Sequence, residues 1–313
     1  MDNITHTLTA VMFSRAGLNR LSPHATALLV VAANAPDLDI LCAIAGPTNY
    51  LHYHRGLTHS ILGVPILALL VAALAMLVAR KSFSWGRAYT LALIGVASNP
   101  LLDCVNAYGV RLLWPFSEHW FNADFVNIFD VWIWVLLALG LVVPWMSALV
   151  SSEIGAQAGK GRGVAIVVLC SLTLYGFGRY LLHERAVAVL DSRIYQSEAP
   201  RRVAAMPTAV NPFRWTGLVE GIGFFKVYPR LNLLEEFDPS EGMLLYKPEP
   251  GPEIKRAAEM EQFRVFLGFA QWPLWSVTPV AEPEGGVQVK LVDLRFGDSH
   301  SFFAVSTVLA PGR

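Results

Sequence analysis

The stretch YHRGLTHSILGVPILALLVAALAML, residues 53–77, changes from polar to strongly apolar within a few positions. Its second part is apolar over nearly the whole length, about 20 residues, that a helix needs to cross a bilayer. Its first part carries His54, Arg55, Thr58 and His59, where the chain would enter the hydrocarbon. Polar side chains at that depth are costly unless the protein pairs or uses them. The stretch therefore predicts a membrane helix with a functional site at its start.

The composition divides the chain into an apolar and a polar part. Of the 313 residues, 54% are hydrophobic and only 15% are charged, whereas soluble domains carry about 25% charged residues. Residues 1–184 contain 19 charged side chains, and the shorter part 185–313 contains 29. We therefore predict a helical membrane domain over 1–184 and a water-exposed domain over 185–313. The net charge is zero and no Lys/Arg run lies among aromatic residues, so a nucleic-acid partner is not expected.

Apolar segments of membrane-spanning length recur along the first domain. Four of them cover residues 60–79, 88–105, 131–150 and 164–182. Two shorter segments, 5–18 and 25–44, precede them, and the second is interrupted by NAPDLD, where Pro36 should end the helix. Short or broken helices are tolerated where they pack within protein. The predicted fold is mainly α: a polytopic helical membrane domain with four spans and two further segments, followed by a β-rich domain.

Histidine and aspartate residues gather at one end of these segments. If all six segments cross, five of them bring such residues to the outer face: His6, Asp37, Asp39, His54, His59, Asp103 and Asp130. One such residue alone is more often a helix cap or an interface group, but seven at one face together favour a metal site. Imidazoles and carboxylates bind zinc, and manganese or iron where carboxylates dominate. Asn99, one turn before Asp103, should face the same cluster.

The residues around the two histidines also predict the local chain path. Gly56 should let the chain turn between His54 and His59, so that both side chains reach the site. Thr58 is the expected N-cap of the helix that follows. Arg55 should either bind an anionic group of a substrate or extend to the lipid headgroups as an anchor.

Five short motifs resemble a known family. They are DNITH at 2–6, NAPDLD at 34–39, HRGLTHS at 54–60, LLD at 101–103 and YGVRLLWPF at 108–116. In this order and spacing they resemble the YdjM-like bacterial membrane-bound metal-dependent hydrolases over residues 1–135. PTAVNPFRW at 207–215 resembles a segment that longer members carry after their membrane part. The His/Asp pattern is more distantly similar to zinc-dependent phospholipase C and P1-type nucleases.

The resemblance implies a ligand set. It carries over as metal ligands His6, Asp37, His54, His59 and Asp103, with Asp39 as a sixth. One position departs from the family: its SHxLLD pattern reads SNPLLD here, so Asn99 stands in place of a histidine. An amide oxygen binds zinc more weakly than an imidazole does, so this substitution should weaken one metal position.

The function expected from these residues is hydrolysis assisted by a divalent metal, with zinc first and manganese or iron as alternatives. The metal would activate water, Asp39 would serve as general base and Arg55 would bind an anionic group. Membrane lipids are the expected partners, and a lipid or lipid-linked phosphoester is the expected substrate. The main alternative is a non-catalytic membrane protein in which a structural metal or the His/Asp cluster ties helix ends together. A transporter fits less well, because transport sites lie near the midplane of the bilayer.

The second domain shows strand-like patterns over 213–245 and 262–310. Expected strands include GFFKVYPRL (223–231), FRVFLGFAQW (263–272) and VQVKLVDLRF (287–296), and a short helix should begin at Glu253. Asp298 and His300 should form a polar turn and not a catalytic dyad. The domain is expected to cover the outer site, or to bind substrate or a partner protein.

Basic residues in the short loops predict the orientation. If six segments cross, one face holds Arg15, Arg20, Arg80, Lys81, Arg87, Lys160 and Arg162. Loops rich in Lys and Arg stay in the cytoplasm, so both termini and the second domain should lie outside the inner (plasma) membrane. A reporter fused after Arg313 should therefore read periplasmic or extracellular, and one inserted at Ser82 should read cytoplasmic. A cytoplasmic signal from the Arg313 fusion would contradict this topology.

Overall fold

The computed structural model describes residues 1–313 except 80–83, 154, 156–160, 283, 298–302 and 311–313. The chain folds into two compact units. The helical unit contains residues 1–41, 53–183 and 207–212, and the β-rich unit contains 42–52, 184–206 and 213–313. The division predicted after residue 184 stays a prediction, because each unit also takes a short piece from the other part of the chain.

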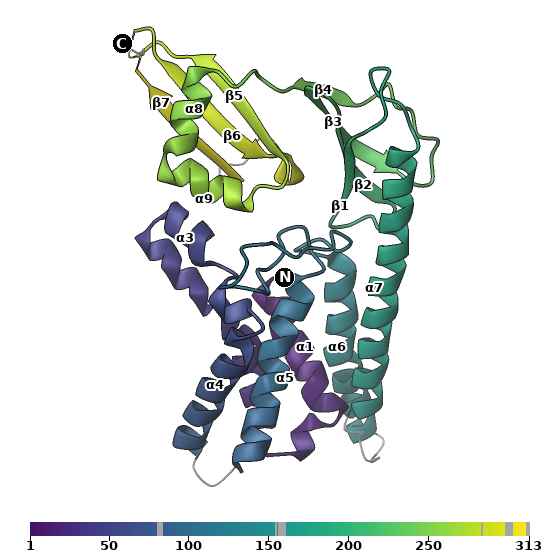
Figure 1. Ribbon diagram of the computed structural model, residues 1–313. Coiled ribbons are helices and arrows are strands. Elements are labelled where there is room, and N and C mark those ends of the chain that lie inside the picture. The colour runs from purple at the N-terminus through teal and green to yellow at the C-terminus, as the bar shows by residue number, and fades with distance from the viewer. Residues whose placement is uncertain (80–83, 154, 156–160, 283, 298–302, 311–313) are drawn as a thin grey trace. The chain divides into compact units, whose positions relative to one another are not determined.

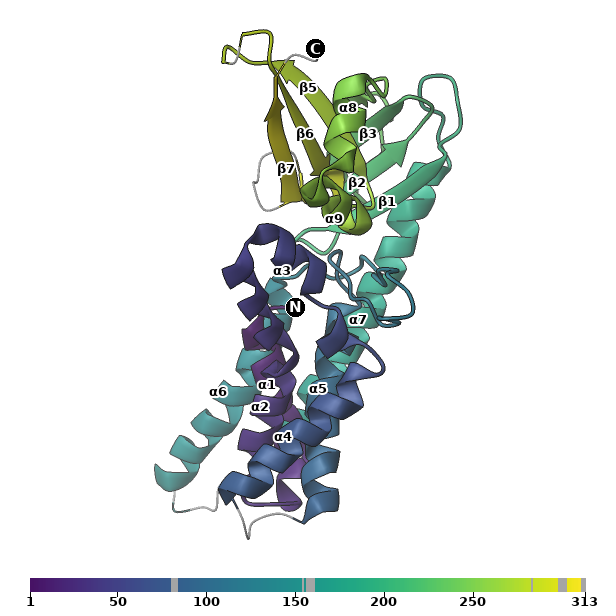
Figure 2. The ribbon, with the colours of Figure 1, turned by 60° about the vertical axis from the view of Figure 1, so that its left-hand side comes forward.

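Six long helices form the helical unit (Figures 1 and 2). They are α1 (Asn3–Ala16), α2 (Ala25–Asn34), α4 (Gly63–Ala79), α5 (Trp85–Asp103), α6 (Val131–Glu153) and α7 (Arg162–Asp191). Short 3-10 helices cover Leu18–Arg20 (η1), Pro36–Ala45 (η2) and Leu57–His59 (η3). Helix α2 packs against α1 and α5, and α4 packs against α5. The mainly helical character predicted for the first part is confirmed.

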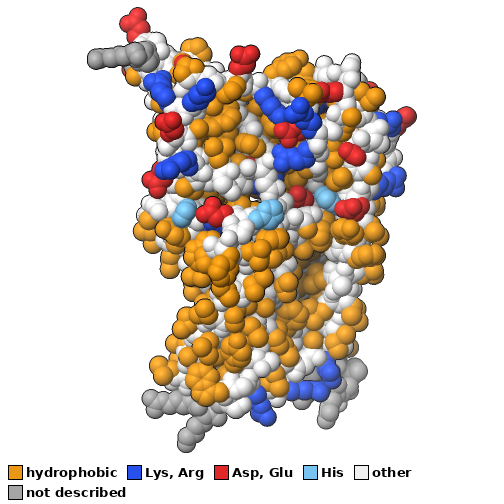
Figure 3. All heavy atoms as spheres, in the orientation of Figure 1, with side chains coloured by type: hydrophobic (Ala, Val, Ile, Leu, Met, Phe, Trp, Pro, Cys, Tyr) orange, Lys and Arg blue, Asp and Glu red, His pale blue; other side chains and the backbone are white. Residues whose placement is uncertain are grey.

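Two helices of the described chain, α6 and α7, are long and apolar enough to cross a membrane. Two bent pairs would raise the number to four if each is one span: residues 25–45, bent by 41°, and 47–79, bent by 77°. The number of spans therefore stays a prediction. Large apolar side chains such as Leu77 and Trp145 are mostly exposed, and hydrophobic side chains cover the visible surface of the helical unit (Figure 3). An apolar surface of this kind is typical of proteins that face lipid or a partner protein.

Small residues let α2 and α5 approach closely. Ala32, Ala33 and Ala92 are fully buried in the core that these helices share with α4. A Cβ atom added at Gly95 would lie 2.5 Å from the Cβ of Ala32 and 2.9 Å from the carbonyl oxygen of Leu29. The absence of a side chain at Gly95 thus sets the distance between the two helices, and with it the distance between their polar ends.

The sequence predicts the helix end after α2 fully and the turn before α4 only in part. Helix α2 ends at Asn34 and the chain continues as η2 from Pro36, as predicted. The chain turns at Gly56 as expected, and Arg55 takes part in the turn: Gly56 has a φ of −95° and a ψ of −108°, and Arg55 has a φ of +55°. The N-cap expected at Thr58 is wrong: the Ser60 hydroxyl accepts from the backbone N–H of Gly63 at 2.9 Å.

The β-rich unit contains two antiparallel sheets. The first has the order β1 (Arg202–Pro207), β2 (Arg214–Glu220), β3 (Phe224–Asn232), β4 (Met243–Tyr246). The second has the order β5 (Pro273–Pro279), β6 (Val287–Asp293), β7 (Ala304–Leu309). Two helices, α8 (Pro252–Glu259) and α9 (Glu261–Phe269), pack on one face of this sheet (Figure 1). A short 3-10 helix, η4, covers Leu294–Phe296. Most of α3 (Pro47–Tyr53) also belongs to this unit, because Leu51 packs against its core.

One predicted strand is a helix. FRVFLGFAQW lies mainly in α9, where Phe263, Phe266 and Phe269 are buried at a spacing of three residues. That spacing fits one face of a helix, but a short apolar run does not by itself distinguish a helix from a buried strand. The helix predicted from Glu253 is confirmed as α8, and the strand at 223–231 is confirmed as β3. Of the strand predicted over 287–296, residues 287–293 form β6 and the last three form η4. Asp298 and His300 lie outside the described residues.

Replacing Gly95 with alanine should destabilise the helical unit, because the added Cβ would overlap backbone and side-chain atoms of α2. We expect a loss of about 1–3 kcal/mol, typical of overpacking a core. Gly86→Ala is the matched control: the same helix, no atom within 4 Å of the added Cβ, and a gain of about 0.5–1 kcal/mol. Unfolding of the detergent-solubilised protein, followed by tryptophan fluorescence, measures both. Equal stability of the two variants would contradict the close α2–α5 contact.

Candidate metal centre

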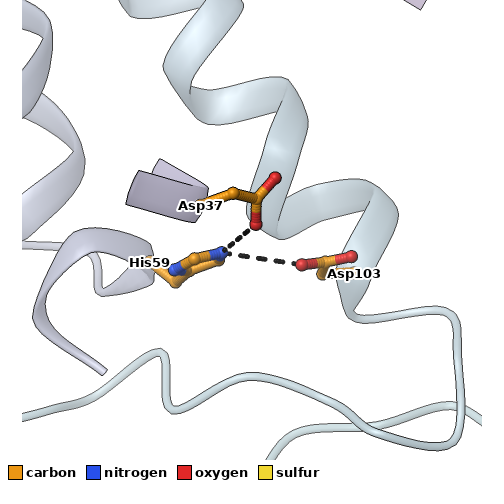
Figure 4. Close-up of side chains that lie close together, drawn as sticks. All are labelled: Asp37, His59 and Asp103. Carbon is orange, nitrogen blue, oxygen red and sulfur yellow. Dashed lines mark ion pairs between the residues drawn. The ribbon is translucent and has the colours of Figure 1, made fainter. Parts of the chain in front are cut away.

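Four ionisable side chains from four elements meet at one end of the helical unit. They are His6 of α1, Asp37 of η2, His59 of η3 and Asp103, the last residue of α5. The Nε2 atom of His59 lies 3.5 Å from Asp37 Oδ1 and 3.6 Å from Asp103 Oδ2 (Figure 4). The Nε2 atom of His6 lies 3.6 Å from Asp103 Oδ1 and 4.0 Å from Asp37 Oδ2. Two imidazole nitrogens thus face two carboxylates.

Asp37, His59 and Asp103 each offer one atom within 4.8 Å of the others, close enough to hold a metal ion, and His6 lies beside this group. His6, His59 and Asp103 are fully buried, and among the described residues neither ring nitrogen of His6 nor Nε2 of His59 has a hydrogen-bond partner. Buried polar atoms are normally satisfied. Ligands about 2.0–2.1 Å from a tetrahedral zinc lie about 3.3 Å apart. This spacing is slightly less than the 3.5 and 3.6 Å that separate His59 Nε2 from Asp37 Oδ1 and Asp103 Oδ2. A small contraction around an ion would bring the atoms of Asp37, His59 and Asp103 to this spacing.

Asp39 and His54 form a pair beside these four residues. Asp39 Oδ1 lies 2.6 Å from His54 Nδ1, and Asp39 Oδ2 accepts from the backbone N–H of Arg55 at 2.8 Å and from the Thr58 hydroxyl at 2.9 Å. Asp39 also lies 3.5 Å from Nδ1 of His59. Carboxylates in such positions orient the imidazoles that bind a metal. The assignment of Asp39 and His54 as ligands stays a prediction.

Arg55 is buried inside the site. Its Nη2 lies 3.0 Å from Asp103 Oδ2, and its Nη1 donates to the Gly109 carbonyl at 3.2 Å. The guanidinium also lies over the ring of Tyr108, 4.7 Å from its centroid. A headgroup anchor needs an exposed guanidinium, and that of Arg55 is only 6% exposed. The geometry therefore favours a role in the site over the anchor.

Asn99 faces the cluster, as predicted. Its Nδ2 donates to Asp37 Oδ2 and to the Ala33 carbonyl, both at 2.9 Å. The first bond fixes one carboxylate of the site, and the second ties α5 to the end of α2, where the chain breaks before Pro36. Asn99 is therefore more than a residue that lines the cavity.

Asp130 does not join the cluster. Its carboxylate accepts from the backbone N–H groups of Trp132 at 3.0 Å and Ile133 at 3.3 Å, and from the Tyr175 hydroxyl at 3.0 Å. It caps the first turn of α6, which is the ordinary role of an aspartate before a helix. Unlike the other His and Asp residues expected at this end of the helices, Asp130 is bonded to the start of its own helix and to Tyr175.

Sequence reasoning missed three contributors to the site. The α-amino group of Met1 contacts Asp103 Oδ1. Asn106 is fully buried; its Oδ1 accepts from the N–H groups of Tyr108 and Gly109 at 2.8 and 3.2 Å. Nη2 of Arg111 donates to the His54 backbone carbonyl at 3.3 Å. The motif YGVRLLWPF was the available signal, because it brings an arginine and aromatic residues into an otherwise apolar region.

Replacing Asn99 with alanine should destabilise the helical unit by about 1–3 kcal/mol, because two buried acceptors lose their donor. The matched control is Ser98→Ala, since the Ser98 hydroxyl donates only to the Gly95 carbonyl of its own helix. Denaturant unfolding in detergent compares the two variants. Equal unfolding free energies for Asn99→Ala and the unmodified protein would show that these hydrogen bonds do not support the site.

Comparison with known proteins agrees with the site's motifs. The uncharacterized protein YfhP of Bacillus subtilis (strain 168) is 28% identical to this chain in a match 313 positions long. The match covers 95% of this chain and 87% of that protein. No solved structure matches this chain. The model of the YdjM inner membrane protein family matches residues 1–185, which hold all the residues of the cluster. The chain therefore belongs to the YdjM inner membrane protein family.

Proposed function

We propose that the protein is a membrane-bound metal-dependent hydrolase that acts on a lipid or lipid-linked phosphoester. One observation carries the proposal: Asp37, His59 and Asp103 lie close enough to hold one metal ion, with His6 buried beside them. Among the described residues, Nε2 of His59 and both ring nitrogens of His6 have no hydrogen-bond partner. Such a donor set, two imidazoles and two carboxylates, suits zinc first and manganese or iron next. A divalent ion held there would supply Lewis acidity and lower the pKa of a coordinated water.

The remaining polar residues have roles that follow from their contacts. Asp39 accepts from His54 Nδ1 and so fixes the orientation of that ring. We assign the general base to this pair, with Asp39 acting through His54 because three donors already occupy its carboxylate. Arg55, 3.0 Å from Asp103, has the charge and the planar donors that bind an anionic group.

The surface beside the cluster supports a lipid substrate. Leu38 lies between Asp37 and Asp39 in the sequence and is 63% exposed; Leu57 precedes Thr58 and is 51% exposed. Ile40 and Ile61 are exposed in the same two segments. Exposed apolar side chains that alternate with partly buried polar ones would bring hydrocarbon close to the site. A substrate with an acyl chain would satisfy this surface while its polar group reaches the cluster.

The proposed orientation puts the cluster at the outer face of the inner membrane. Arg162 donates to the Ala16 carbonyl at the C-terminal end of α1, at 2.8 Å, whereas His6 lies in the first half of that helix. The basic residues and the cluster therefore occupy opposite ends of α1. Because basic loops remain cytoplasmic, the cluster and the C-terminal domain would face outward.

A non-catalytic role is the second candidate, and one observation favours it. His6, His59 and Asp103 are fully buried, as in structural metal sites, which are closed to solvent. Asn99 in place of the family histidine also lowers the number of strong ligands. In this case, the ion or the cluster would hold the ends of four segments together without turnover.

Metal analysis combined with turnover separates the two candidates. The purified protein should contain about one equivalent of a divalent metal or more, and His59→Ala should lose most of it, whereas the exposed His119→Ala should not. Bis(p-nitrophenyl) phosphate and mixed micelles of phosphatidylglycerol are the substrates to be tested. Hydrolysis that EDTA abolishes and zinc restores would support the hydrolase.

Bound metal without turnover of either substrate would favour the structural role. A protein that retains no metal after purification, and binds none on addition of zinc, manganese or iron, would contradict the hydrolase and leave only the metal-free form of the second candidate. His119→Ala must keep the metal content of the unmodified protein; otherwise the loss in His59→Ala is not specific to the cluster.

A further inference from the structure

The backbone at Arg55 has a conformation that the residue itself does not favour. Its φ of +55° lies in the left-handed region, which residues other than glycine, asparagine and aspartate seldom adopt. Gly56 follows directly, yet has a negative φ. The sequence therefore offers a glycine next to the strained position and not at it. Surrounding contacts must hold Arg55 in place.

Arg111 supplies these contacts from one side and Asp39 from the other. The backbone N–H of Arg111 donates to the Arg55 carbonyl at 3.0 Å, and its Nη2 donates to the His54 carbonyl at 3.3 Å. On the opposite side, Asp39 Oδ2 accepts from the Arg55 N–H at 2.8 Å. Both peptide groups around the strained residue are thus fixed by partners that are distant in the sequence.

The Arg111 side chain is itself held in a buried layer. Arg111 is 5% exposed, and its guanidinium lies 5.0 Å from the centroid of the Trp120 ring. Trp120 contacts Tyr108 edge to face at 5.6 Å, and Tyr108 lies under Arg55. Two guanidiniums and two aromatic rings therefore form one packed group beside the His59 segment.

Gly56 makes room for Arg111. A Cβ atom at this position would lie 3.0 Å from Arg111 Nη2 and 3.1 Å from the Tyr53 carbonyl oxygen. The glycine is needed for this approach, and also for its backbone conformation, because its ψ of −108° lies outside the regions that residues with a Cβ favour. The HRG sequence at 54–56 thus combines a strained arginine with the glycine that admits its support.

We propose that Arg111 is a positioning residue of the metal site: it holds His54 and Arg55 so that the Arg55 guanidinium reaches Asp103 and the His54 ring reaches Asp39. Without this clamp, Arg55 would relax to negative φ and its side chain would leave Asp103. Asp103 would then lose the partner that orients its carboxylate toward His6 and His59. The inference rests on the metal site proposed above.

The test measures Mn²⁺ binding to the full-length protein in detergent by electron paramagnetic resonance. Arg111→Ala should bind Mn²⁺ about 10–100-fold more weakly, the usual effect of losing an outer-shell partner. Arg111→Lys should recover little, because one ammonium does not replace the planar fork. Added methylguanidinium should restore the affinity of Arg111→Ala. The exposed Arg20→Ala is the control and should bind as the unmodified protein does.

Gly56→Ala provides a second, independent variant, since it keeps Arg111 but displaces its guanidinium. It should weaken Mn²⁺ binding in the same direction, and it decides the matter if Arg111→Ala does not fold. Unchanged Mn²⁺ affinity in folded Arg111→Ala, or in Gly56→Ala, would overturn the inference and leave the metal site standing. An unmodified protein that binds neither Mn²⁺ nor zinc would overturn the proposed function, and this inference with it.

Discussion

The carboxylate of Asp103 is fully buried at the end of an apolar helix bundle, and the groups that balance its negative charge organise the site. A buried anion is costly unless cations and donors surround it. Arg55 and the α-amino group of Met1 contact it directly, and His6 and His59 face it at 3.6 Å. Met1 precedes α1 and His6 lies in it, whereas His59 ends η3 and Arg55 lies in the turn before η3. One buried charge thus requires segments that are distant in the sequence to meet.

The apolar packing below the site makes this meeting possible. Gly95 brings α5 against α2, and Asn99, one turn further along, reaches both the Ala33 carbonyl and Asp37. Polar residues sit at the helix ends because neither hydrocarbon nor the tightly packed interior would accept them. The loop of residues 104–130, which carries Asn106 and Arg111, then closes over these ends. The packing of α2 against α5 sets the distance between the helix ends, and the charge of Asp103 requires cationic or donor side chains there.

The sequence predicted the parts of the site that depend on periodicity and helix breaking. Pro36 removes a backbone donor, so α2 had to end near Asn34; Asn99 and Asp103, four apart, had to share a face. The contacts of Arg111 and Asn106 were not predictable, because they come from a loop whose path follows from long-range hydrogen bonds. Thr58 and Ser60 are equally good caps by type, and only the contact of Thr58 with Asp39 distinguishes them.

The chain passes between its two compact units five times, after residues 41, 52, 183, 206 and 212. Two of these passages lie between Asp39 and His54, and the piece they enclose, 42–52, carries Leu51 into the core of the β-rich unit. The piece 207–212 does the reverse: its backbone carbonyls accept from Asn127, Val131 and Arg179. The two units are therefore not consecutive in the sequence. A chain cut near residue 185 would lack the piece 207–212, which belongs to the helical unit, and would leave the piece 42–52 without the core against which Leu51 packs.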